Sequence, residues 1–464
     1  MKAHLTLLAT GLLLAACASP LPVPDSGIQP PAAWQNLDTP GTRADNQQWW
    51  TQFGSPQLNR LIEQARLDSH DLAAAMARVR QAQASAVIAG APLLPEIRAG
   101  LNGNRQELLR GKGYSQLDVD RNNRTIDYYD ANLSASYELD FWGGKRAARD
   151  SALSTLSASQ FDRATVELTL LSSVANSYTQ ALSLNEQQRI AELNLANAQR
   201  VLDLVQTRYD AGSATALELS QQKSLVATQQ RQLPLVQQQA RDALITLAAL
   251  LGQPVQSVRL DTENFDRLHW PSIDAGVPSE LLRRRPDIAA AEARLSAAKA
   301  DITVARAAML PSVTLGLSLG TGADIADQLL RNNFYNLTAG LAAPIFNNGR
   351  LSAERDRATA RQEELLELYR AAIINGFADV EKALNSIHGL DQQRQWQAEE
   401  LHQAQTAFDL AQSRYQAGAE DLLTVLETQR TLYAAQDMNV QLRLARVQAS
   451  VALYRALGGG WEVM

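Results

Sequence analysis

Residues 283–320 read RRRPDIAAAEARLSAAKADITVARAAMLPSVTLGLSLG, and this stretch changes from a helical pattern to a strand pattern partway along. The proline and aspartate after the three arginines suit the first turn of a helix, and the alanine-rich run that follows favours its continuation. From Val313 to Leu319, apolar residues instead alternate with small or polar residues, which is the period of a β-strand. The change falls at Leu310-Pro311, because a proline disfavours helical backbone at the residue before it.

The same helix-to-strand pattern occurs twice in the chain. Residues 71–79 (DLAAAMARV) align with residues 287–295 (DIAAAEARL), and Pro95 occupies the place in the first copy that Pro311 occupies in the second. An ordered match of this length indicates a duplicated unit. We therefore expect a fold of mixed α and β class, in which each repeat has the order helix, strand, strand, helix.

The N-terminus has the pattern of a bacterial lipoprotein signal. A basic start at Met1-Lys2 precedes an apolar core, and Leu14-Ala15-Ala16 precedes Cys17, the single cysteine of the chain. We expect cleavage before Cys17 and attachment of a lipid such as palmitate to this cysteine. Ala18, which follows it, is compatible with delivery to the outer membrane. The alternative is an ordinary signal peptide with an incidental cysteine.

These features divide the chain into five expected parts. The parts are a signal peptide at 1–16, a lipid-anchored extended segment at 17–55, a first repeat at 56–255, a linker at 256–279 and a second repeat at 280–464. The anchored segment contains Trp49, Trp50 and Phe53. Because large aromatic side chains are costly to leave in water, we expect this part to pack onto the body of the fold.

Each repeat holds two segments in which apolar residues alternate with small or polar ones. The four segments are 97–101, 129–141, 313–319 and 335–345. One apolar face and one polar face on each strand is the pattern of a transmembrane β-strand, with lipid on one side and water on the other. A soluble four-stranded sheet with one buried face is the alternative.

The strands are the candidate membrane-spanning elements of this sequence. No apolar run after the N-terminus approaches the ~18 residues that a membrane-spanning helix needs. Four strands are too few to close a barrel with a usable lumen, since the smallest membrane barrels need about eight. We therefore expect several copies of the chain to associate, which removes the free strand edges.

Long helices make up most of the remaining sequence. The expected helices are 56–94, 147–209, 215–251, 351–415 and 421–457. Some 60 residues of helix span roughly 90 Å, a length that an ordinary globular core does not require. Pro234 lies inside the helix expected at 215–251, and it predicts a kink or a break there.

Matching turns end the two longest helices. Their sequences are Arg208-Tyr209-Asp210-Ala211-Gly212 and Arg414-Tyr415-Gln416-Ala417-Gly418. Glycine suits the left-handed conformation that often ends a helix. Apolar residues recur every three or four positions around both turns, as in a coiled-coil seam. The predicted seam residues are Leu195, Ala198, Leu202, Val205 and Tyr209, then Leu401, Ala404, Phe408, Ala411 and Tyr415, and finally Leu422, Val425, Gln429 and Leu432.

Composition and motifs disfavour an enzyme and a nucleic-acid-binding protein. The chain has 43 Lys and Arg against 49 Asp and Glu, a formal net charge of −6, and no basic block. Its five histidines lack metal-ligand spacing, and the sequence has neither a phosphate-binding loop nor a Gly-x-Ser-x-Gly elbow. We expect no enzymatic activity, no metal or cofactor, and no nucleic-acid partner.

Several motifs together resemble the TolC-like outer-membrane factor family, in its lipid-anchored branch that serves resistance-nodulation-division efflux pumps. They are Arg285-Pro286-Asp287-Ile288, the two Leu-Pro junctions, the segment from Trp49 to Leu58 and the paired Arg-Tyr-x-Ala-Gly turns. The resemblance covers essentially the whole chain after the signal peptide. It implies a homotrimer in which each chain gives four strands to a twelve-stranded β-barrel in the outer membrane. A long α-helical coiled-coil barrel would continue this β-barrel into the periplasm.

The resemblance also implies a function. The protein would be the exit duct of a tripartite efflux or secretion system, and it would conduct small molecules passively to the exterior. Its partners would be a periplasmic adaptor and an inner-membrane pump, and antibiotics, siderophores and other small molecules all remain open as cargo. The alternative is a non-conducting periplasmic coiled-coil lipoprotein that acts as a scaffold, although a scaffold has no need of lipid-facing strands.

In that family, inward side chains just past the Arg-Tyr turns close the periplasmic end of the tunnel. Carried onto this sequence, Glu427 would form an acidic ring, Leu423 an apolar constriction, and Glu218 an acidic position in the first repeat. Thr424 stands where another family pattern has aspartate. Three like carboxylates brought together by symmetry favour cations, whereas solvated surface glutamates are the alternative reading. The expected adaptor-docking residues are Arg208, Tyr209, Gly212, Arg414, Tyr415 and Gly418.

Overall fold

The structure, a computed structural model, describes most of the chain. The described residues are 26–35, 42–43, 48–107, 109, 125–260, 265–271 and 273–459. Cys17 and the signal peptide predicted at 1–16 lie outside these residues. Cleavage of the signal and attachment of a lipid therefore stay predictions.

The chain divides into two compact units. The first, which we call the strand unit, contains the described residues of Val79–Ser159 and Ala291–Tyr369. The second, which we call the helical unit, contains the described residues of Gly27–Arg78, Gln160–Ala290 and Arg370–Met464. Each unit therefore combines residues from both predicted repeats.

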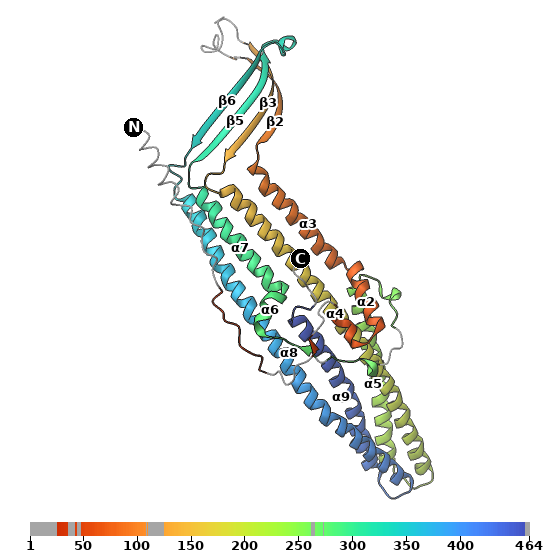
Figure 1. Ribbon diagram of the computed structural model, residues 1–464. Helices are drawn as coiled ribbons and strands as arrows, with labels where there is room; N and C mark the ends of the chain where they lie inside the picture. The colour runs from red at the N-terminus through yellow and green to blue at the C-terminus, as the bar shows by residue number, and fades with distance from the viewer. Residues whose placement is uncertain are drawn as a thin grey trace. The chain divides into compact units, whose positions relative to one another are not determined.

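The strand unit contains one antiparallel sheet of four strands in the order β2-β3-β5-β6 (Figure 1). The strands are β2 (Glu96–Glu107), β3 (Thr125–Leu139), β5 (Ser312–Ala323) and β6 (Asn333–Ala342). Strands β2 and β5 begin one residue after Pro95 and Pro311, respectively. All four predicted strands are present, and the observed strand ends differ from the predicted ones by a few residues.

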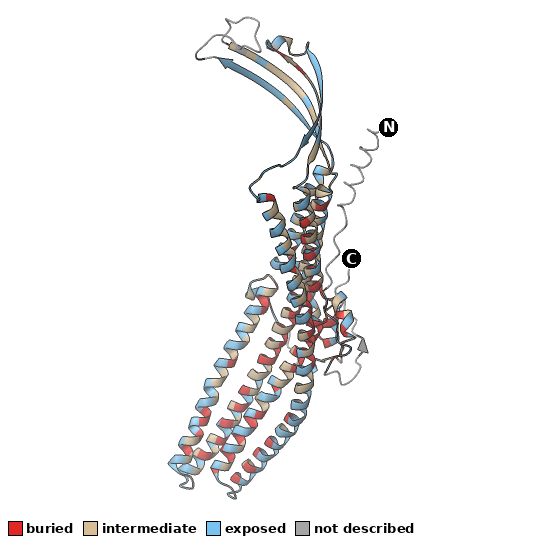
Figure 2. Cartoon of the chain, turned by 90° about the vertical axis from the view of Figure 1, so that its left-hand side faces the viewer, coloured by how far each residue is buried: buried red, intermediate tan, exposed pale blue. Residues whose placement is uncertain are grey.

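The register of the sheet places the alternating residues on two separate faces. Ala99, Leu133, Leu319 and Tyr335 lie directly opposite one another across the four strands. The neighbouring row on the other face is polar and consists of Arg98, Ser134, Ser318 and Asn336. The apolar face is open, since Leu101, Tyr335 and Leu337 are 76%, 77% and 74% exposed. All ten residues of β6 are exposed, and Figure 2 shows the sheet coloured mainly as exposed or intermediate.

The transition from helix to strand is fixed by local backbone geometry. Leu94, before the first proline, has extended backbone angles (φ −119°, ψ 155°), as expected for a residue before proline. The amide of Leu310, before the second proline, donates to the carbonyl of Ala307 and closes the last turn. The indole nitrogen of Trp142 donates to the carbonyl oxygen of Pro311 at 2.7 Å, so this junction is also held by a contact from beyond β3.

The single helix predicted for residues 56–94 is wrong. The structure has α2 (Pro56–Asp68), α3 (His70–Gly90) and a short 3-10 helix, η2 (Ala91–Leu93). Ser69 separates the first two, with an extended ψ of 122°. Its hydroxyl oxygen accepts a hydrogen bond from the amide of Leu72 at 3.4 Å, so Ser69 ends one helix and caps the next.

The remaining helices follow the predicted order. They are α4 (Gly144–Asp210), α5 (Ala216–Leu250), α6 (Pro278–Arg284), α7 (Pro286–Ala307), α8 (Arg350–Gln416) and α9 (Leu422–Ala456), with the short η3 (Val255–Ser257), η4 (Phe265–Arg267) and η5 (Ala326–Gln328). Of the kink or break predicted at Pro234, the break is absent, because α5 continues through this residue. A proline removes a single backbone hydrogen bond, and the turns on either side maintain the helix. Among the described residues, no helix is both long enough and apolar enough to cross a membrane.

The aromatic segment before α2 is buried in the helical unit, as predicted. Trp49 and Phe53 of η1 (Trp49–Phe53) are 0% exposed. The ring of Trp49 stacks on that of Tyr454 in α9, with centroids 5.2 Å apart, and the Tyr454 hydroxyl donates to Gln52 at 2.7 Å. The aromatic segment is thus attached to α9, the last long helix.

The linker and the N-terminal segment contact each other within the helical unit. Strand β1 (Thr42–Arg43) pairs in parallel with β4 (Ile273–Asp274). The indole of Trp34 donates to the carbonyl of Gly276 at 2.9 Å and meets the ring of Phe377 edge to face. Sequence patterns gave no sign of this pairing, since two-residue strands have no measurable period.

Arg285 joins three helices of the helical unit. It is 9% exposed, and its guanidinium pairs with Asp287 at 2.6 Å and with Asp379 of α8 at 3.0 Å. It also donates to the carbonyl oxygen of Ala456, the last residue of α9, at 3.2 Å. The Arg-Pro-Asp motif therefore ties the start of α7 to α8 and α9.

Candidate functional site

The candidate site lies where α4 turns into α5 and α8 turns into α9, within the helical unit. We call α4 with α5 the first hairpin and α8 with α9 the second hairpin. In the first turn, the amide of Gly212 donates to the carbonyl of Tyr209 at 2.9 Å, and that of Ser213 donates to the carbonyl of Arg208 at 2.8 Å. In the second turn, Gly418 and Ala419 repeat these two bonds at 3.0 and 2.9 Å.

This pair of bonds is the Schellman pattern of helix termination, which needs a left-handed residue after the helix. Gly212 and Gly418 have φ angles of +72° and +77°. A side chain is unfavourable in that conformation, which explains why both turns carry glycine at this place. The predicted role of these glycines in ending the helices agrees with the geometry.

Each returning helix begins with a side-chain cap. Thr215 and Glu218 form a capping box on α5: the amide of Glu218 donates to the Thr215 hydroxyl oxygen at 3.2 Å, and the amide of Thr215 donates to the Glu218 carboxylate at 2.5 Å. On α9, the Asp421 carboxylate accepts from the amide and the hydroxyl of Thr424, both at 2.9 Å. These bonds lower the pKa of Asp421, the backbone bond having the larger effect.

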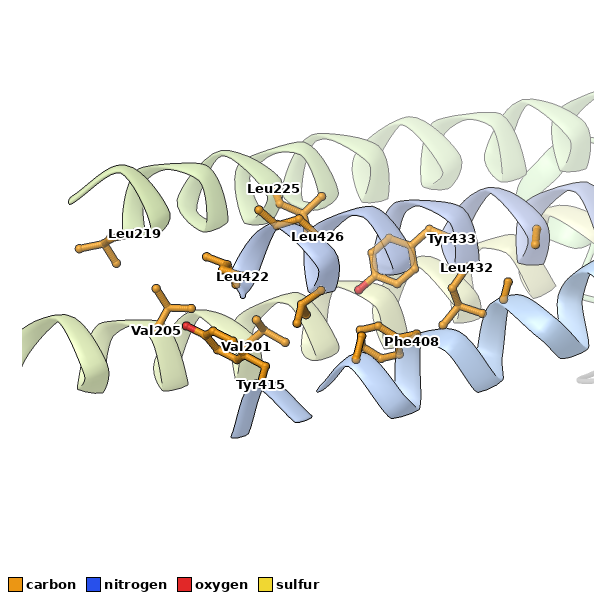
Figure 3. Packing of buried hydrophobic residues seen from close by; sticks show 14 residues of the cluster. Val201, Val205, Leu219, Leu225, Phe408, Tyr415, Leu422, Leu426, Leu432 and Tyr433 are labelled. Atoms are coloured by element: carbon orange, nitrogen blue, oxygen red, sulfur yellow. The ribbon is translucent and has the colours of Figure 1, made fainter. Parts of the chain in front are cut away.

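Fourteen buried apolar residues fill the space between the four helices (Figure 3). They include Tyr415 (2% exposed), Leu422 (1%) and Val425 (0%). The predicted seam is confirmed in the second hairpin, where all of its members except the partly buried Leu401 are buried. In the first hairpin Ala198 and Val205 are buried, and Leu195 and Leu202 are partly buried.

Tyr209 does not belong to this core. It is 41% exposed, whereas Tyr415, the matching residue of the second turn, is buried. Tyr415 belongs to the buried cluster, and the guanidinium of Arg208 lies over its ring at 4.5 Å. Among the described residues, no cation lies over the ring of Tyr209 in the same way. A helical period alone therefore predicted the wrong environment for this tyrosine.

Polar contacts also cross from the second hairpin to the first. The hydroxyl of Tyr433 on α9 donates to the carbonyl oxygen of Asn194 on α4 at 2.8 Å. The same hydroxyl accepts a hydrogen bond from the side-chain amide of Gln429 at 2.6 Å. Burial raises the pKa of Tyr433 to about 12, so the phenol stays protonated and able to donate.

The structure places Leu423 and Glu427 together on the exposed side of α9. They are one helical turn apart, Leu423 is 54% exposed, and Glu427 is exposed. Thr424 lies beside them and is held by the cap at Asp421. Glu218, in contrast, is half-buried and engaged in its capping box. Among the described residues, no hydrogen bond or ion pair joins Glu218 to Glu427.

Two features of the site were missed from the sequence. The capping box could have been found, since Thr215-Ala-Leu-Glu218 has the expected Thr-x-x-Glu spacing at the start of a helix. The stacking of Arg208 on Tyr415 has no local signal, because these residues come from different repeats. Arg414, the counterpart of Arg208, is 62% exposed and pairs with Glu420 at 3.2 Å.

The described residues contain no group of His, Cys, Asp or Glu side chains that could hold a metal ion. The carboxylates of Glu218 and Asp421 are engaged in the helix caps of the two hairpins. In the described part of the chain, no second carboxylate joins Glu427 in a metal-binding group. The site therefore consists of an exposed surface at the two turns over a packed apolar core.

Comparison with known proteins gives consistent matches over nearly the whole chain. The family model described as outer membrane efflux protein matches residues 61–253 and again 277–459. The pyoverdine export outer membrane protein OpmQ of Pseudomonas aeruginosa is 63% identical over 461 residues, which are 99% of this chain and 97% of that protein. The cation efflux system protein CusC of Escherichia coli is 31% identical over 424 residues, which are 90% of each chain.

Solved structures agree with these matches. The outer-membrane channel OprN superposes with a TM-score of 0.89 at 27% sequence identity, covering 96% of this chain and 99% of that one. The family model thus matches this chain twice, over two successive stretches.

Proposed function

Because this chain belongs to the outer membrane efflux protein family, and is an outer membrane efflux channel, we propose that three copies of it form the exit duct of a tripartite export system. The observation that carries this proposal is the sheet. Its apolar face is open, and its edge strands β2 and β6 each pair on one side only among the described residues. An open apolar face of this size fits lipid or a partner, and free strand edges fit further strands.

A trimer satisfies both requirements. Three sheets joined edge to edge give twelve strands, with β6 of one copy beside β2 of the next, and closure leaves no edge. The apolar rows then face lipid, and the small and polar rows face a water-filled lumen. The periplasmic adaptor and the inner-membrane pump are the remaining partners, and the two Arg-Tyr turns with Gly212 and Gly418 are the surface that we propose for the adaptor.

The proposed cargo is a siderophore of the pyoverdine class. The support is the 63% identity with a protein named for pyoverdine export, over 99% of this chain. A protein named for cation efflux is only 31% identical. The inner-membrane pump supplies the energy, and the duct conducts passively.

The cargo is tested by deleting the chromosomal copy and measuring pyoverdine in the medium and in the periplasm. We expect less siderophore in the medium and accumulation in the periplasm, with recovery on complementation. An unchanged distribution of pyoverdine between the medium and the periplasm would refute the proposed cargo. The same strain, tested against a set of antibiotics, separates siderophore export from general drug efflux.

The duct itself is tested with purified protein. A closed barrel migrates differently on a detergent gel before and after heating, and it conducts ions in a planar bilayer. The alternative, a non-conducting coiled-coil scaffold, predicts neither property. Mass spectrometry of the mature N-terminus tests the lipid anchor, since an unmodified Cys17 would exclude it.

We further propose that Leu423 and Glu427 narrow the periplasmic end of the duct. The support is that both residues lie on the exposed side of α9, just after its cap at Asp421. Three such helices around a symmetry axis would bring three leucines and three carboxylates together. Glu427→Gln should change the single-channel conductance or the cation selectivity. Glu399→Gln, an exposed carboxylate on α8, is the control. If the two variants behave alike, Glu427 has no role in the constriction.

A further inference from the structure

Two aromatic side chains lie on the polar face of the sheet in the strand unit, near the strand ends that are farthest from Pro95 and Pro311. They are Tyr128 of β3 and Phe334 of β6, which are 46% and 43% exposed. Two rows of this face that lie nearer the prolines consist of small, polar or charged residues, namely Glu96, Ser136, Gly316 and Thr338, then Arg98, Ser134, Ser318 and Asn336. Open aromatic surface therefore distinguishes one end of the polar face.

Both rings extend over the backbone of β5, where the sequence has glycine. A Cβ atom added at Gly320 would lie 2.8 Å from Cζ of Phe334, and one added at Gly322 would lie 2.5 Å from the hydroxyl oxygen of Tyr128. The glycines therefore leave room for a ring from β6 and a ring from β3 to approach the same strand. The two glycines are neighbours on one face of β5, roughly 6.6 Å apart along the strand.

A carboxylate lies beside the two rings on the same face. Asp130, two residues after Tyr128, is directly opposite Gly322 in the pairing of β3 with β5. Its Oδ2 atom accepts hydrogen bonds from the side-chain amides of Asn132 at 2.7 Å and Asn102 at 3.1 Å. Among the described residues, no hydrogen bond or ion pair reaches its Oδ1 atom. Two amides thus hold the carboxylate in place while one of its oxygens stays open.

From this we infer that the polar face of the sheet holds a binding site for an organic ammonium group. The open faces of Tyr128 and Phe334 attract a cation through their ring quadrupoles, and the carboxylate of Asp130 supplies the opposite charge. The inference rests on the proposed duct, in whose lumen this face would lie. It names a chemical group of the cargo that the wall of the duct recognises.

The occupant is a small cation rather than lipid or a second copy of the chain. Lipid contacts the opposite face, where the apolar rows lie, in the proposed barrel. A second copy joins at the edge strands β2 and β6, whereas Asp130, Gly320 and Gly322 belong to β3 and β5, the two inner strands. A neutral planar ring would also pack on the aromatic side chains, but it would gain nothing from the charge of Asp130.

Choline and its uncharged isostere dimethylbutanol test the site, because the two molecules have nearly the same shape. Saturation-transfer NMR on the detergent-solubilised full chain measures the affinity of each from its methyl signal. We expect choline to bind several-fold more tightly than dimethylbutanol. Equal affinities would overturn the recognition of charge and would favour a neutral ligand.

Variants then assign the binding to these residues. Phe334→Leu should weaken choline binding about two- to fivefold, and Asp130→Asn about threefold. The double variant Asp130→Asn/Phe334→Leu should weaken it about tenfold. Tyr335→Leu is the matched control, because this exposed tyrosine is the next residue of β6 and lies on the opposite face. Phe334→Tyr keeps the ring and should bind choline as the parent protein does, which separates loss of the ring from loss of folding.

A bilayer measurement separates this site from the proposed duct. Potassium chloride current through the parent protein tests the duct, and choline should reduce that current less in Asp130→Asn/Phe334→Leu than in Tyr335→Leu. If the parent conducts but binds choline no better than the double variant, the rings only shield the glycines of β5; the site is then wrong and the duct stands. If the parent does not conduct but its choline binding is lost in the double variant, the duct is wrong and the site stands.

Discussion

Replacing Arg285 with methionine should loosen the end of α9 while leaving the strand unit unchanged. Methionine keeps the length and the apolar stem of the side chain but removes the guanidinium. Asp287, Asp379 and the carbonyl oxygen of Ala456 then each lose a hydrogen-bond donor.

The size of the effect follows from how exposed each partner is. The side chains of Asp287 and Asp379 are 38% and 44% exposed, so solvent limits each ion pair to roughly 0.5–1 kcal/mol. The bond to the carbonyl of Ala456 is buried, and an acceptor left unpaired there costs about 1–3 kcal/mol. We therefore expect a loss of about 3 kcal/mol in the free energy of local opening, which is about a hundredfold in the opening equilibrium.

Hydrogen exchange measured by mass spectrometry gives a direct readout. Peptides that cover the end of α9, near Leu457, should exchange about a hundredfold faster in the variant, whereas peptides from β5 and β6 should not change. Arg283→Met is the matched control, because Arg283 is exposed and lies two residues earlier. Unchanged exchange in Arg285→Met, or an equal change in Arg283→Met, would refute the assignment of Arg285 as the link between these helices.

Three further predictions concern the hairpins and the aromatic cluster. Gly418→Ala places a side chain at φ +77° and should cost roughly 1–2 kcal/mol, seen as a lower unfolding temperature. Ala417→Gly, at the neighbouring residue, is the control, because it puts no side chain into the left-handed conformation. Thr215→Ala removes the cap of α5 and should cost about 1 kcal/mol, and Thr215→Ser should recover most of it in the same melting experiment. Burial raises the pKa of Tyr454 to about 12, above the unfolded value near 10. The stability contributed by its protonated phenol is therefore complete below pH 10 and is lost as the pH rises toward 12. Tyr454→Phe should therefore reduce the loss of stability between pH 10 and 12. An unfolding temperature that falls as steeply with pH in the variant as in the parent protein would contradict this.

Much of the fold could be read from the sequence because its signals are local and repeated. The strands show a clear period of two, and the two longest helices, α4 and α8, contain no proline. The glycines of the turns are required by the left-handed backbone at Gly212 and Gly418. The break at Ser69 was missed because the apolar pattern continues across it, and a single side-chain cap outweighs a continuing period.

The site was predicted less completely, for a different physical reason. The ring of Tyr415 is covered by Arg208, and that arginine comes from the other repeat. Arg285 was recognisable as part of a motif, but its partners Asp379 and Ala456 lie far along the chain. Contacts between distant segments have no periodicity to read.

The stacking of Trp49 on Tyr454 has a consequence for how the chain is made. Gln52 and Tyr454, joined by a hydrogen bond in the same cluster, are 402 positions apart in the sequence. During synthesis and export, Trp49 and Phe53 emerge early and stay exposed until α9 arrives to cover them. The apolar rings of this segment are therefore open to non-native contacts for almost the entire passage of the chain, and the arrival of Tyr454 ends that interval.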